Sequence, residues 1–323
     1  MTTIASAAGL AGCATLAASG KSHPSNVSTD YVSAPRTPLP KGSCDCHVHI
    51  FDPGLFPYVP ERTYTPGTAT VSDLLAFEGK LGVERVVLVQ PSGYGTDNRC
   101  LVDALKQLGP QRARGVAVVD VDKVSAAEIE QLHAAGVRSI RLNLEVKGEH
   151  SSDRAKAALQ SALKVVAAKQ WSIQIYADLN LIEALANVLA SAKTPIVLDH
   201  FAGLKAEKGL NQPGFATVLK LLRNGNVYVK LSAPYRPSKL ADYADLQPFV
   251  RELVAAGPSK LVWASDWPHT GSSSNRSGDL SKVESFRSID SGKVLEQLAG
   301  WVGDASIWTR IMVQNPATLY GFD

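Results

Sequence analysis

The sequence predicts an α/β protein, and within that class a (β/α)8 TIM barrel formed by a single domain. Three observations support this fold. Eight short runs rich in β-branched residues alternate with amphipathic segments after residue 43. Runs such as 86–89 (VVLV) and 116–119 (VAVV) lack polar alternation, as parallel strands buried on both faces do. Eight such units in about 270 residues match the usual length of this barrel.

The predicted elements alternate in order along the chain. The predicted strands are Cys44–His49, Arg85–Gln90, Arg114–Val119, Val137–Asn143, Ser172–Ala177, Ile196–His200, Val227–Leu231 and Leu261–Ser265. The predicted helices are Val71–Leu81, Asn98–Leu108, Ser125–Ala135, Asp153–Lys169, Leu181–Ala190, Gly214–Arg223, Ala241–Ala256, Lys293–Trp301 and Ser306–Gln314. Because a helix follows each strand, we expect the strands to lie parallel.

The third predicted helix shows the basis of these assignments. Ser125 can cap its first turn, and Glu128 stands three residues later, as in a capping box. Ile129, Leu132 and neighbouring alanines form one apolar stripe, and Gly136 follows as a stop. The segment therefore has a start signal, an amphipathic body and an end signal.

Bulk composition is that of an ordinary globular protein. The chain has 323 residues, of which 45% are hydrophobic and 20% charged. Its net charge of +3 is not gathered into a basic run, so the sequence does not predict a nucleic-acid partner. An open, doubly wound sheet is the alternative architecture, and it would place a ligand where the strand order reverses.

The N-terminal segment has a different character from the rest of the chain. Its first 22 residues are rich in alanine and glycine without acidic residues, and resemble the hydrophobic part of a bacterial export signal that lacks its basic start. The residues ending at Cys13 (LAGC) resemble a lipoprotein processing box. We therefore expect a signal-like segment and linker over 1–41, a barrel domain over 42–323, and export to the periplasm, with or without a lipid anchor, rather than a cytoplasmic location. No later apolar run is long enough for a transmembrane helix.

Polar side chains stand at the carboxyl ends of the predicted strands, which meet at one mouth of a (β/α)8 barrel. His47 and His49 end the first strand, and their i, i+2 spacing places both on one face. Asp199 directly precedes His200, so alternation turns it to the opposite face as a supporting or loop carboxylate. Asp178 either faces the mouth or caps the following helix. The candidate residues at this mouth are His47, His49, Ser92, Arg141, Tyr176, His200, Arg236 and Asp266.

These residue types allow two chemistries. Three histidines and a carboxylate can hold one divalent metal such as zinc and make its bound water nucleophilic. Alternatively, the histidines polarise a carbonyl group while Asp266 acts as general base on water. Both routes lead to hydrolysis of an acyl or ester bond, and arginines at the mouth add bidentate recognition of carboxylates. The chain contains no nucleophile elbow and no phosphate-binding glycine motif.

Cys44 and Cys46 share one face of the first strand. Their C-x-C spacing is tighter than zinc sites usually have. We expect them to be small buried packing residues, and the four cysteines of the chain indicate no disulfide framework.

Several motifs, taken in order, carry a family resemblance. They are DCHVHIFDP around the histidine pair, VQPSGYGTDN (89–98), IRLN (140–143), LDHFAG (198–203), SDWPHT (265–270) and the terminal NPATLYGF. Together they resemble the amidohydrolase-related group of the amidohydrolase superfamily, which contains 2-pyrone-4,6-dicarboxylate lactonase, sulfomuconolactone hydrolase and galactarolactone isomerase. The likeness extends from about Ser43 to Phe322.

The resemblance implies roles for individual residues. His47 and His49 match the histidine pair of strand one, His200 the histidine of strand six, and Asp266 the aspartate of strand eight that activates water. The positions that match substrate-binding residues are Ser92, Arg141, Tyr176 and Arg236.

Two departures from the family pattern concern the substrate. The family's arginine after the strand-six histidine is absent near Leu204, and Lys147 replaces a second arginine beyond strand four. We expect Lys147 to contribute to substrate binding, but a compact ammonium does not reproduce the forked contact of arginine. The pyrone dicarboxylate itself is therefore in doubt, whereas hydrolysis of a lactone is not.

The resemblance also concerns the metal. Members with two metals use a carboxylated lysine or glutamate at strand four, where Arg141 stands here, and Tyr176 replaces the usual strand-five histidine. A single ion would have His47, His49, His200 and Asp266 as ligands. This set has one ligand fewer than the zinc-dependent decarboxylases of the superfamily, and the related lactonases work without metal. From the ligand count we favour a mechanism with no cofactor and keep a single zinc ion as the alternative.

Three functions follow from these expectations. The first is a lactonase, a hydrolase acting on a small carboxylated lactone of pyrone dicarboxylate, muconolactone or sugar-acid type. The second is a metal-dependent decarboxylase or lactone isomerase of the same superfamily. The third is a non-catalytic, exported acid-binding protein, which would have no need of the complete set of histidines and Asp266. We prefer the first, and the sequence makes no prediction of oligomeric state.

Overall fold

Eight parallel strands occupy the centre of the molecule in a computed structural model that describes residues 27–144, 151–271 and 278–322. The strands pair in the order of the chain without a reversal. Their bounds are β1 (Cys44–Val48), β3 (Arg85–Val89), β4 (Ala113–Ala117), β5 (Val137–Asn143), β6 (Ser172–Tyr176), β7 (Ile196–Leu198), β8 (Val227–Ser232) and β9 (Leu261–Ala264). The predicted (β/α)8 barrel is therefore confirmed, and the doubly wound alternative is excluded.

The barrel closes between β1 and the residues that follow β9. The amide of His49 donates to the carbonyl of Trp267 at 2.9 Å, and the amide of Asp266 donates to the carbonyl of His47 at 3.0 Å. Three of these four residues are candidate site residues. The hydrogen bonds that close the barrel therefore also bring these candidate site residues together.

A buried carboxylate, two residues before His47 in β1, also contributes to this closure. Asp45 accepts the amide of Ser265 at 3.0 Å, where a barrel ladder would use a backbone carbonyl. Burial raises the pKa of Asp45 to about 6. Glu78 lies beside it, and burial followed by the charge of Asp45 raises the pKa of Glu78 well above its ordinary value.

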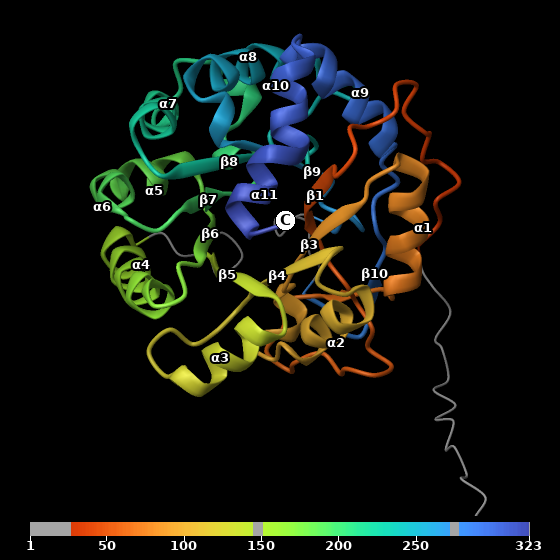
Figure 1. Cartoon of the computed structure of the whole chain (residues 1–323), viewed down its shortest axis with the longest axis vertical. Coiled ribbons are helices and arrows are strands. Elements are labelled where there is room, and N and C mark those ends of the chain that lie inside the picture. The colour runs from red at the N-terminus through yellow and green to blue at the C-terminus, as the bar shows by residue number, and fades with distance from the viewer. Residues whose placement is uncertain (1–26, 145–150, 272–277, 323) are drawn as a thin grey trace, which may run out of the picture.

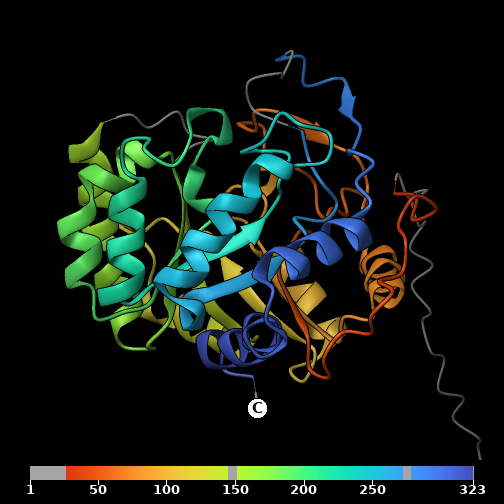
Figure 2. The same cartoon turned by 90° about the horizontal axis from the view of Figure 1, so that it is seen from above.

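Helices surround the strands on the outside (Figure 1 and Figure 2). They are α1 (Val71–Leu81), α2 (Arg99–Leu108), α3 (Ala126–Ala134), α4 (Ser152–Ala167), α5 (Leu179–Ala184), α6 (Ala186–Ser191), α7 (Phe215–Asn224), α8 (Gln247–Ala256), α9 (Ser291–Val302), α10 (Ala305–Thr309) and α11 (Asn315–Tyr320). Ser125 caps α3 by accepting the amide of Glu128 at 3.2 Å, as predicted. The single helix predicted over 181–190 is instead divided into α5 and α6 at Leu185.

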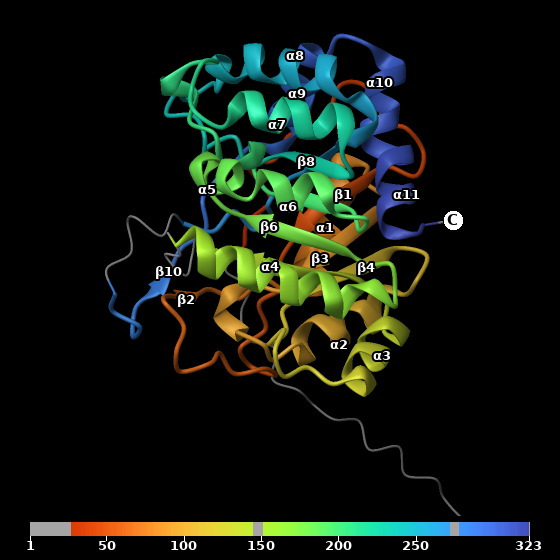
Figure 3. The same ribbon diagram turned by 90° about the vertical axis from the view of Figure 1, so that its left-hand side faces the viewer.

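Apolar side chains fill the space between strands and helices and also one end of the barrel interior. The interior cluster consists of Cys44, Cys46, Val87, Val89, Val116, Val197, Tyr228, Val262, Ala264, Leu319, Tyr320 and Phe322. Cys44 and Cys46 are buried, free thiols, as predicted for packing residues. Figure 3 shows α11 and the C-terminus at this end of the barrel. Polar side chains are thereby left to the opposite end.

A small ribbon at that opposite end was not predicted. β2 (Thr65–Pro66) and β10 (Val283–Glu284) pair in parallel, away from the end that α11 covers (Figure 3). Two residues are too few to show a strand period in a sequence. The ribbon joins the loop after β1 to the loop after β9 above the mouth of the barrel.

Residues 27–41, expected to be a linker, pack against the barrel domain. Val32 is 5% exposed, and the backbone amide and hydroxyl of Ser33 donate to Asp290 at 2.9 and 2.8 Å. The backbones approach so closely that a Cβ on Gly292 would lie 1.8 Å from the Ser33 carbonyl oxygen. The signal-like residues with Cys13 lie outside the described residues, so export remains a prediction. Within the described residues, no helix has the length and apolar character needed to cross a membrane.

Candidate active site

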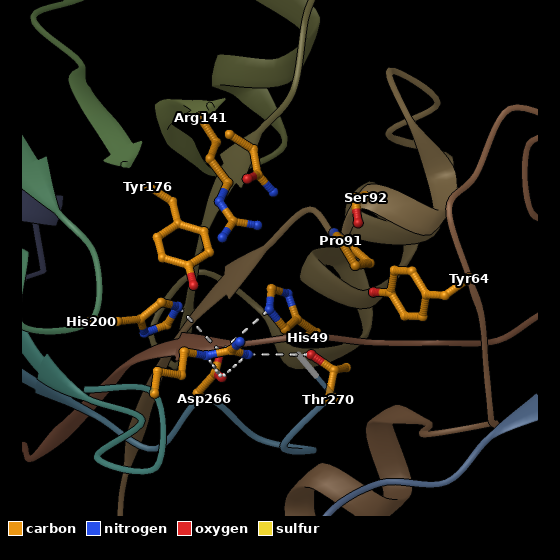
Figure 4. Close-up of a pocket in the computed structure, with 12 residues that line it drawn as sticks. His49, Tyr64, Pro91, Ser92, Arg141, Tyr176, His200, Asp266 and Thr270 are labelled. Carbon is orange, nitrogen blue, oxygen red and sulfur yellow. Dashed lines mark hydrogen bonds and ion pairs between the residues drawn. The ribbon is translucent and has the colours of Figure 1, made fainter. Parts of the chain in front are cut away.

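A small, polar cavity opens at the carboxyl ends of the strands. Its lining contains most of the predicted site residues, and Figure 4 shows their side chains directed toward a common space. The lining residues are His49, Tyr64, Pro91, Ser92, Arg141, Asn143, Tyr176, His200, Arg236, Asp266, Thr270 and Gly271. His47 is fully buried behind this lining, and Lys147 lies outside the described residues.

Asp266 lies at the bottom of the cavity, and its two carboxylate oxygens have different surroundings. Oδ2 accepts the hydroxyl of Tyr235 at 2.7 Å and the guanidinium of Arg236 at 2.7 and 3.1 Å. Oδ1 accepts no hydrogen bond from the described residues. Burial alone would raise the pKa of Asp266, but Arg236 and then His200 outweigh it and hold that pKa well below its ordinary value.

Three imidazole rings surround the unpartnered oxygen of Asp266. Their Nε2 atoms lie 3.6 Å (His47), 3.7 Å (His49) and 3.8 Å (His200) from Oδ1. Burial, followed by Lys230, lowers the pKa of His47 well below its ordinary value, and burial lowers the pKa of His200 to about 3. Both of these rings are therefore neutral at pH 7 and carry one hydrogen each.

The Nδ1 atoms of His49 and His200 face partners outside the cavity. His49 Nδ1 lies 2.7 Å from the carbonyl oxygen of Val89. A carbonyl oxygen only accepts, so His49 carries a hydrogen on Nδ1, and in the neutral ring the lone pair is then at Nε2. His200 Nδ1 lies 2.9 Å from the hydroxyl of Ser232, which either donates or accepts.

A charged network lies beneath His47, inside the barrel. Lys230 is fully buried on β8, and its Nζ lies 3.1 Å from His47 Nδ1 and 2.6 Å from Gln174 Oε1. Asp199 lies 3.4 Å from the same ammonium, and it accepts Gln174 at 2.9 Å and Arg141 at 3.3 Å. Sequence analysis assigned no role to Lys230 or Gln174. The available signal was a long polar residue inside each of two otherwise apolar strands.

The predicted orientation of Asp199, away from the site, is wrong, whereas its predicted role as a supporting carboxylate agrees with its position behind His47 and outside the cavity lining. β7 ends at Leu198, and His200 has a φ of 49°, in the left-handed region. Strand alternation therefore stops before these residues, and Asp199 turns inward to lie 3.3 Å from His47 Nδ1. Asp178, for which two roles were open, caps α5 by accepting the amide of Leu181 at 2.8 Å.

Two arginines give the cavity positive charge, but each already has a carboxylate partner. Arg141 contacts Asp199, and Arg236 binds Asp266. A substrate that contacts Arg236, as expected from the sequence, would therefore share its guanidinium with Asp266, the candidate base. Sequence reasoning missed this pair because the loop after β8 has no periodicity from which a contact could be read. It also missed Tyr64 and Thr270, which lie in long loops and line the cavity.

The donor atoms converge as they would around a metal ion, but their partners do not all fit one. His47, His49 and Asp266 offer atoms within 4.8 Å of one another. A zinc ligand needs a ring nitrogen with a free lone pair. The Lys230 ammonium, which only donates, lies 3.1 Å from His47 Nδ1. A neutral His47 that accepts this bond carries its hydrogen on Nε2, the nitrogen turned toward Asp266.

A second possible metal group, composed of His47, Asp199 and His200, has the ammonium of Lys230 within 3.4 Å of its carboxylate. With His47 unable to offer Nε2, the four-ligand zinc site predicted from the sequence keeps three of its ligands. The arrangement suits acid–base chemistry on a carbonyl compound that carries negative charge.

Comparisons with known proteins agree with this geometry. The model of a family described as Amidohydrolase matches residues 44–322. A 2-pyrone-4,6-dicarboxylate hydrolase from Comamonas testosteroni is 33% identical over an alignment of 299 residues, which covers 89% of this chain and 93% of the relative. A 4-sulfomuconolactone hydrolase from Rhizobium radiobacter is 31% identical and covers 88% of this chain and 91% of its own length.

Among solved structures, a probable 2-pyrone-4,6-dicarboxylic acid hydrolase from Acinetobacter baumannii with citric acid bound superimposes with a TM-score of 0.74. It is 28% identical, and the match covers 87% of this chain and 100% of that structure. The residues that the family model matches, 44–322, include every strand of the barrel and all residues that line the cavity.

Proposed function

Because the chain belongs to the amidohydrolase family, we propose that it hydrolyses a small carboxylated lactone without a metal cofactor. The observation that carries the proposal is the unpartnered Oδ1 of Asp266, enclosed by three imidazoles at the base of a cavity with two arginines. Two relatives named as hydrolases of a pyrone dicarboxylate and of a sulfomuconolactone support this substrate class.

In the proposed reaction, Asp266 Oδ1 accepts a proton from a water molecule held between Asp266 and His200. The water oxygen adds to the lactone carbonyl carbon. Tyr176 and an imidazole N–H at the cavity stabilise the negative charge that develops on the carbonyl oxygen. The ring C–O bond then breaks, and the ring oxygen takes the proton from Asp266 to give an open-chain acid.

Arg141 and Arg236 favour a substrate that carries a carboxylate. A substrate carboxylate that shares Arg236 weakens the ion pair between Arg236 and Asp266. Asp266 then becomes a stronger base than it is in the free protein, because a nearby positive charge lowers the basicity of a carboxylate. Carboxylated lactones should therefore react faster than their neutral methyl esters.

The central test is Asp266→Asn, assayed on lactones of aromatic-catabolism and sugar-acid type. We expect kcat to fall about 10³-fold, since the general base is removed, while circular dichroism and thermal unfolding stay close to the unmodified protein. Asp103→Asn, which alters a carboxylate that contacts Gln107 on α2, is the matched control and should keep full activity. Near-normal turnover by Asp266→Asn would show that the base is assigned wrongly.

The same assays run with and without a chelator separate the alternatives. Loss of activity on chelation, restored by zinc, would contradict the metal-free mechanism and favour the metal-dependent decarboxylase or isomerase. Absence of turnover on every lactone, with tight binding of one acid, would favour a binding protein.

A further inference from the structure

The hydrogen positions of the His47–His49 pair are fixed from both ends. At one end His49 Nδ1 must donate to the Val89 carbonyl, so in the neutral ring His49 Nε2 has the lone pair. That lone pair lies 3.3 Å from His47 Nε2. The contact is a hydrogen bond when His47 carries its hydrogen on Nε2, and a repulsion between two lone pairs when it does not.

At the other end, His47 Nδ1 must then accept, and Lys230 is placed to donate to it at 3.1 Å. Asp199 is the competing partner for an Nδ1 hydrogen, at 3.3 Å, and the ammonium of Lys230 is the closer of the two groups. Three hydrogen bonds thus run in one direction, from Lys230 through His47 and His49 to Val89.

We propose that Lys230 is a positioning residue that holds His47 in the Nε2–H tautomer, so that His47 and His49 form an oriented hydrogen-bonded pair instead of a metal site. Its role in turnover rests on the proposed lactone hydrolysis, whereas the tautomer does not. His47 does not line the cavity, so it acts through His49 and through the space beside Asp266 Oδ1, 3.6 Å from its Nε2.

The surroundings of Lys230 suit this task. Its side chain is fully buried, and Gln174 and Asp199 hold its ammonium from below, 2.6 and 3.4 Å away. A lysine fixed in this way cannot swing toward the cavity or toward solvent. Its positive charge behind the ring polarises the Nε2–H of His47 toward the reaction centre, where negative charge develops.

The direct test is the tautomer of His47 in the unmodified, full-length protein. Two-bond ¹H–¹⁵N spectra of protein labelled with ¹⁵N-histidine distinguish a protonated from an unprotonated ring nitrogen, and His47→Gln identifies the resonances of His47. We expect an unprotonated Nδ1 and a protonated Nε2. The reverse pattern would mean that Asp199 accepts from His47, and it would overturn the proposal.

Zinc binding gives a second test that needs no substrate. After removal of metals with a chelator, zinc titrated into the unmodified protein should bind weakly. Lys230→Met, which keeps the aliphatic stem, should bind zinc at least about tenfold more tightly, because His47 can then turn its lone pair to Nε2. Lys260→Met removes a lysine beside Tyr228 on another part of the barrel and should behave like the unmodified protein. Tight, stoichiometric zinc in the unmodified protein would contradict the proposal.

Turnover is measured separately. Lys230→Met should lower kcat about 100-fold with KM changed less than about threefold, since the hydrogen bonds that orient His47 and His49 beside Asp266 are broken. If the unmodified protein shows the predicted tautomer but hydrolyses no lactone, the proposed function fails and the assignment of Lys230 stands. If it is an active lactonase with the other tautomer, the assignment fails alone. Should Lys230→Met not fold, the spectra of the unmodified protein still decide.

Discussion

At the scale of single residues, the ion pair between Arg236 and Asp266 governs the chemistry of the cavity. Arg236 contacts Asp266 Oδ2 through both Nε and a terminal nitrogen. A carboxylate held this way is well oriented but weakly basic, because the guanidinium stabilises its ionised form. The ion pair therefore makes Asp266 a weaker base but keeps it ionised over a wider pH range.

Replacing Arg236 should shift the pH dependence of the reaction. Arg236 lowers the pKa of Asp266, so Arg236→Gln should raise that pKa and leave Asp266 protonated up to a higher pH. The acidic limb of kcat/KM against pH should move upward by about 1–3 pH units. Arg236→Lys, which keeps the charge, should move the limb less. An unchanged limb in Arg236→Gln would show that another group titrates there.

At the scale of elements, the sequence predicted most where strands and helices are regular. The eight strands and the capped α3 follow from hydrophobic runs and end signals, and the predicted cavity residues on strand ends, such as Tyr176, meet there. Prediction failed where regular backbone stops. Asp199 lies one residue beyond β7, where alternation no longer applies, and Arg236 lies in a loop after β8. The partners of a residue such as Lys230 depend on which strands face one another across the barrel, and no local pattern records this.

The junction of β1 and α1 contains a buried acid pair that should make stability depend on pH. The folded pKa of Glu78 lies above its unfolded value, so the folded state binds the proton more tightly, and its stability falls as pH rises above about 4.5. Glu78→Gln removes this loss. Its free energy of unfolding should exceed that of the unmodified protein by about 1–3 kcal/mol at pH 8 and by less at pH 5.

Urea unfolding at the two pH values measures this difference. Glu128→Gln, on the exposed first turn of α3, is the matched control and should show no such dependence. A gain in Glu78→Gln that is equal at both pH values would mean that burial of a charge is not its cause.

At the scale of the whole molecule, the segment before β1 is part of the packed structure. Ser33 is tied to Asp290, at the start of α9, and the absence of a side chain at Gly292 allows the two backbones to meet. The segment is rich in serine and proline, and this composition predicted a linker. Composition indicates how flexible a segment is on its own, but it does not show that another part of the chain offers a surface on which the segment can pack.

Two glycines of α9 make this packing testable. Gly292→Ala places a methyl group against the Ser33 carbonyl and should destabilise the protein by about 1–3 kcal/mol. Gly300→Ala, in the same helix with no atom within 4 Å of the new methyl, should stabilise it by about 0.5–1 kcal/mol. Thermal unfolding measures both, and limited proteolysis should cut the segment 27–41 faster in Gly292→Ala. Equal stability of the two variants would show that the segment is not held by this contact.

The closure of the barrel through His47 and Asp266 has a consequence for how such a protein can diversify. The backbone bond between these residues is also a bond of the barrel wall, so the base cannot be displaced without opening the fold. Tyr64, Ser92 and Thr270 line the cavity but do not form the hydrogen bonds that close the barrel. Directed evolution toward a new lactone should therefore gather its accepted changes in the loops around the mouth.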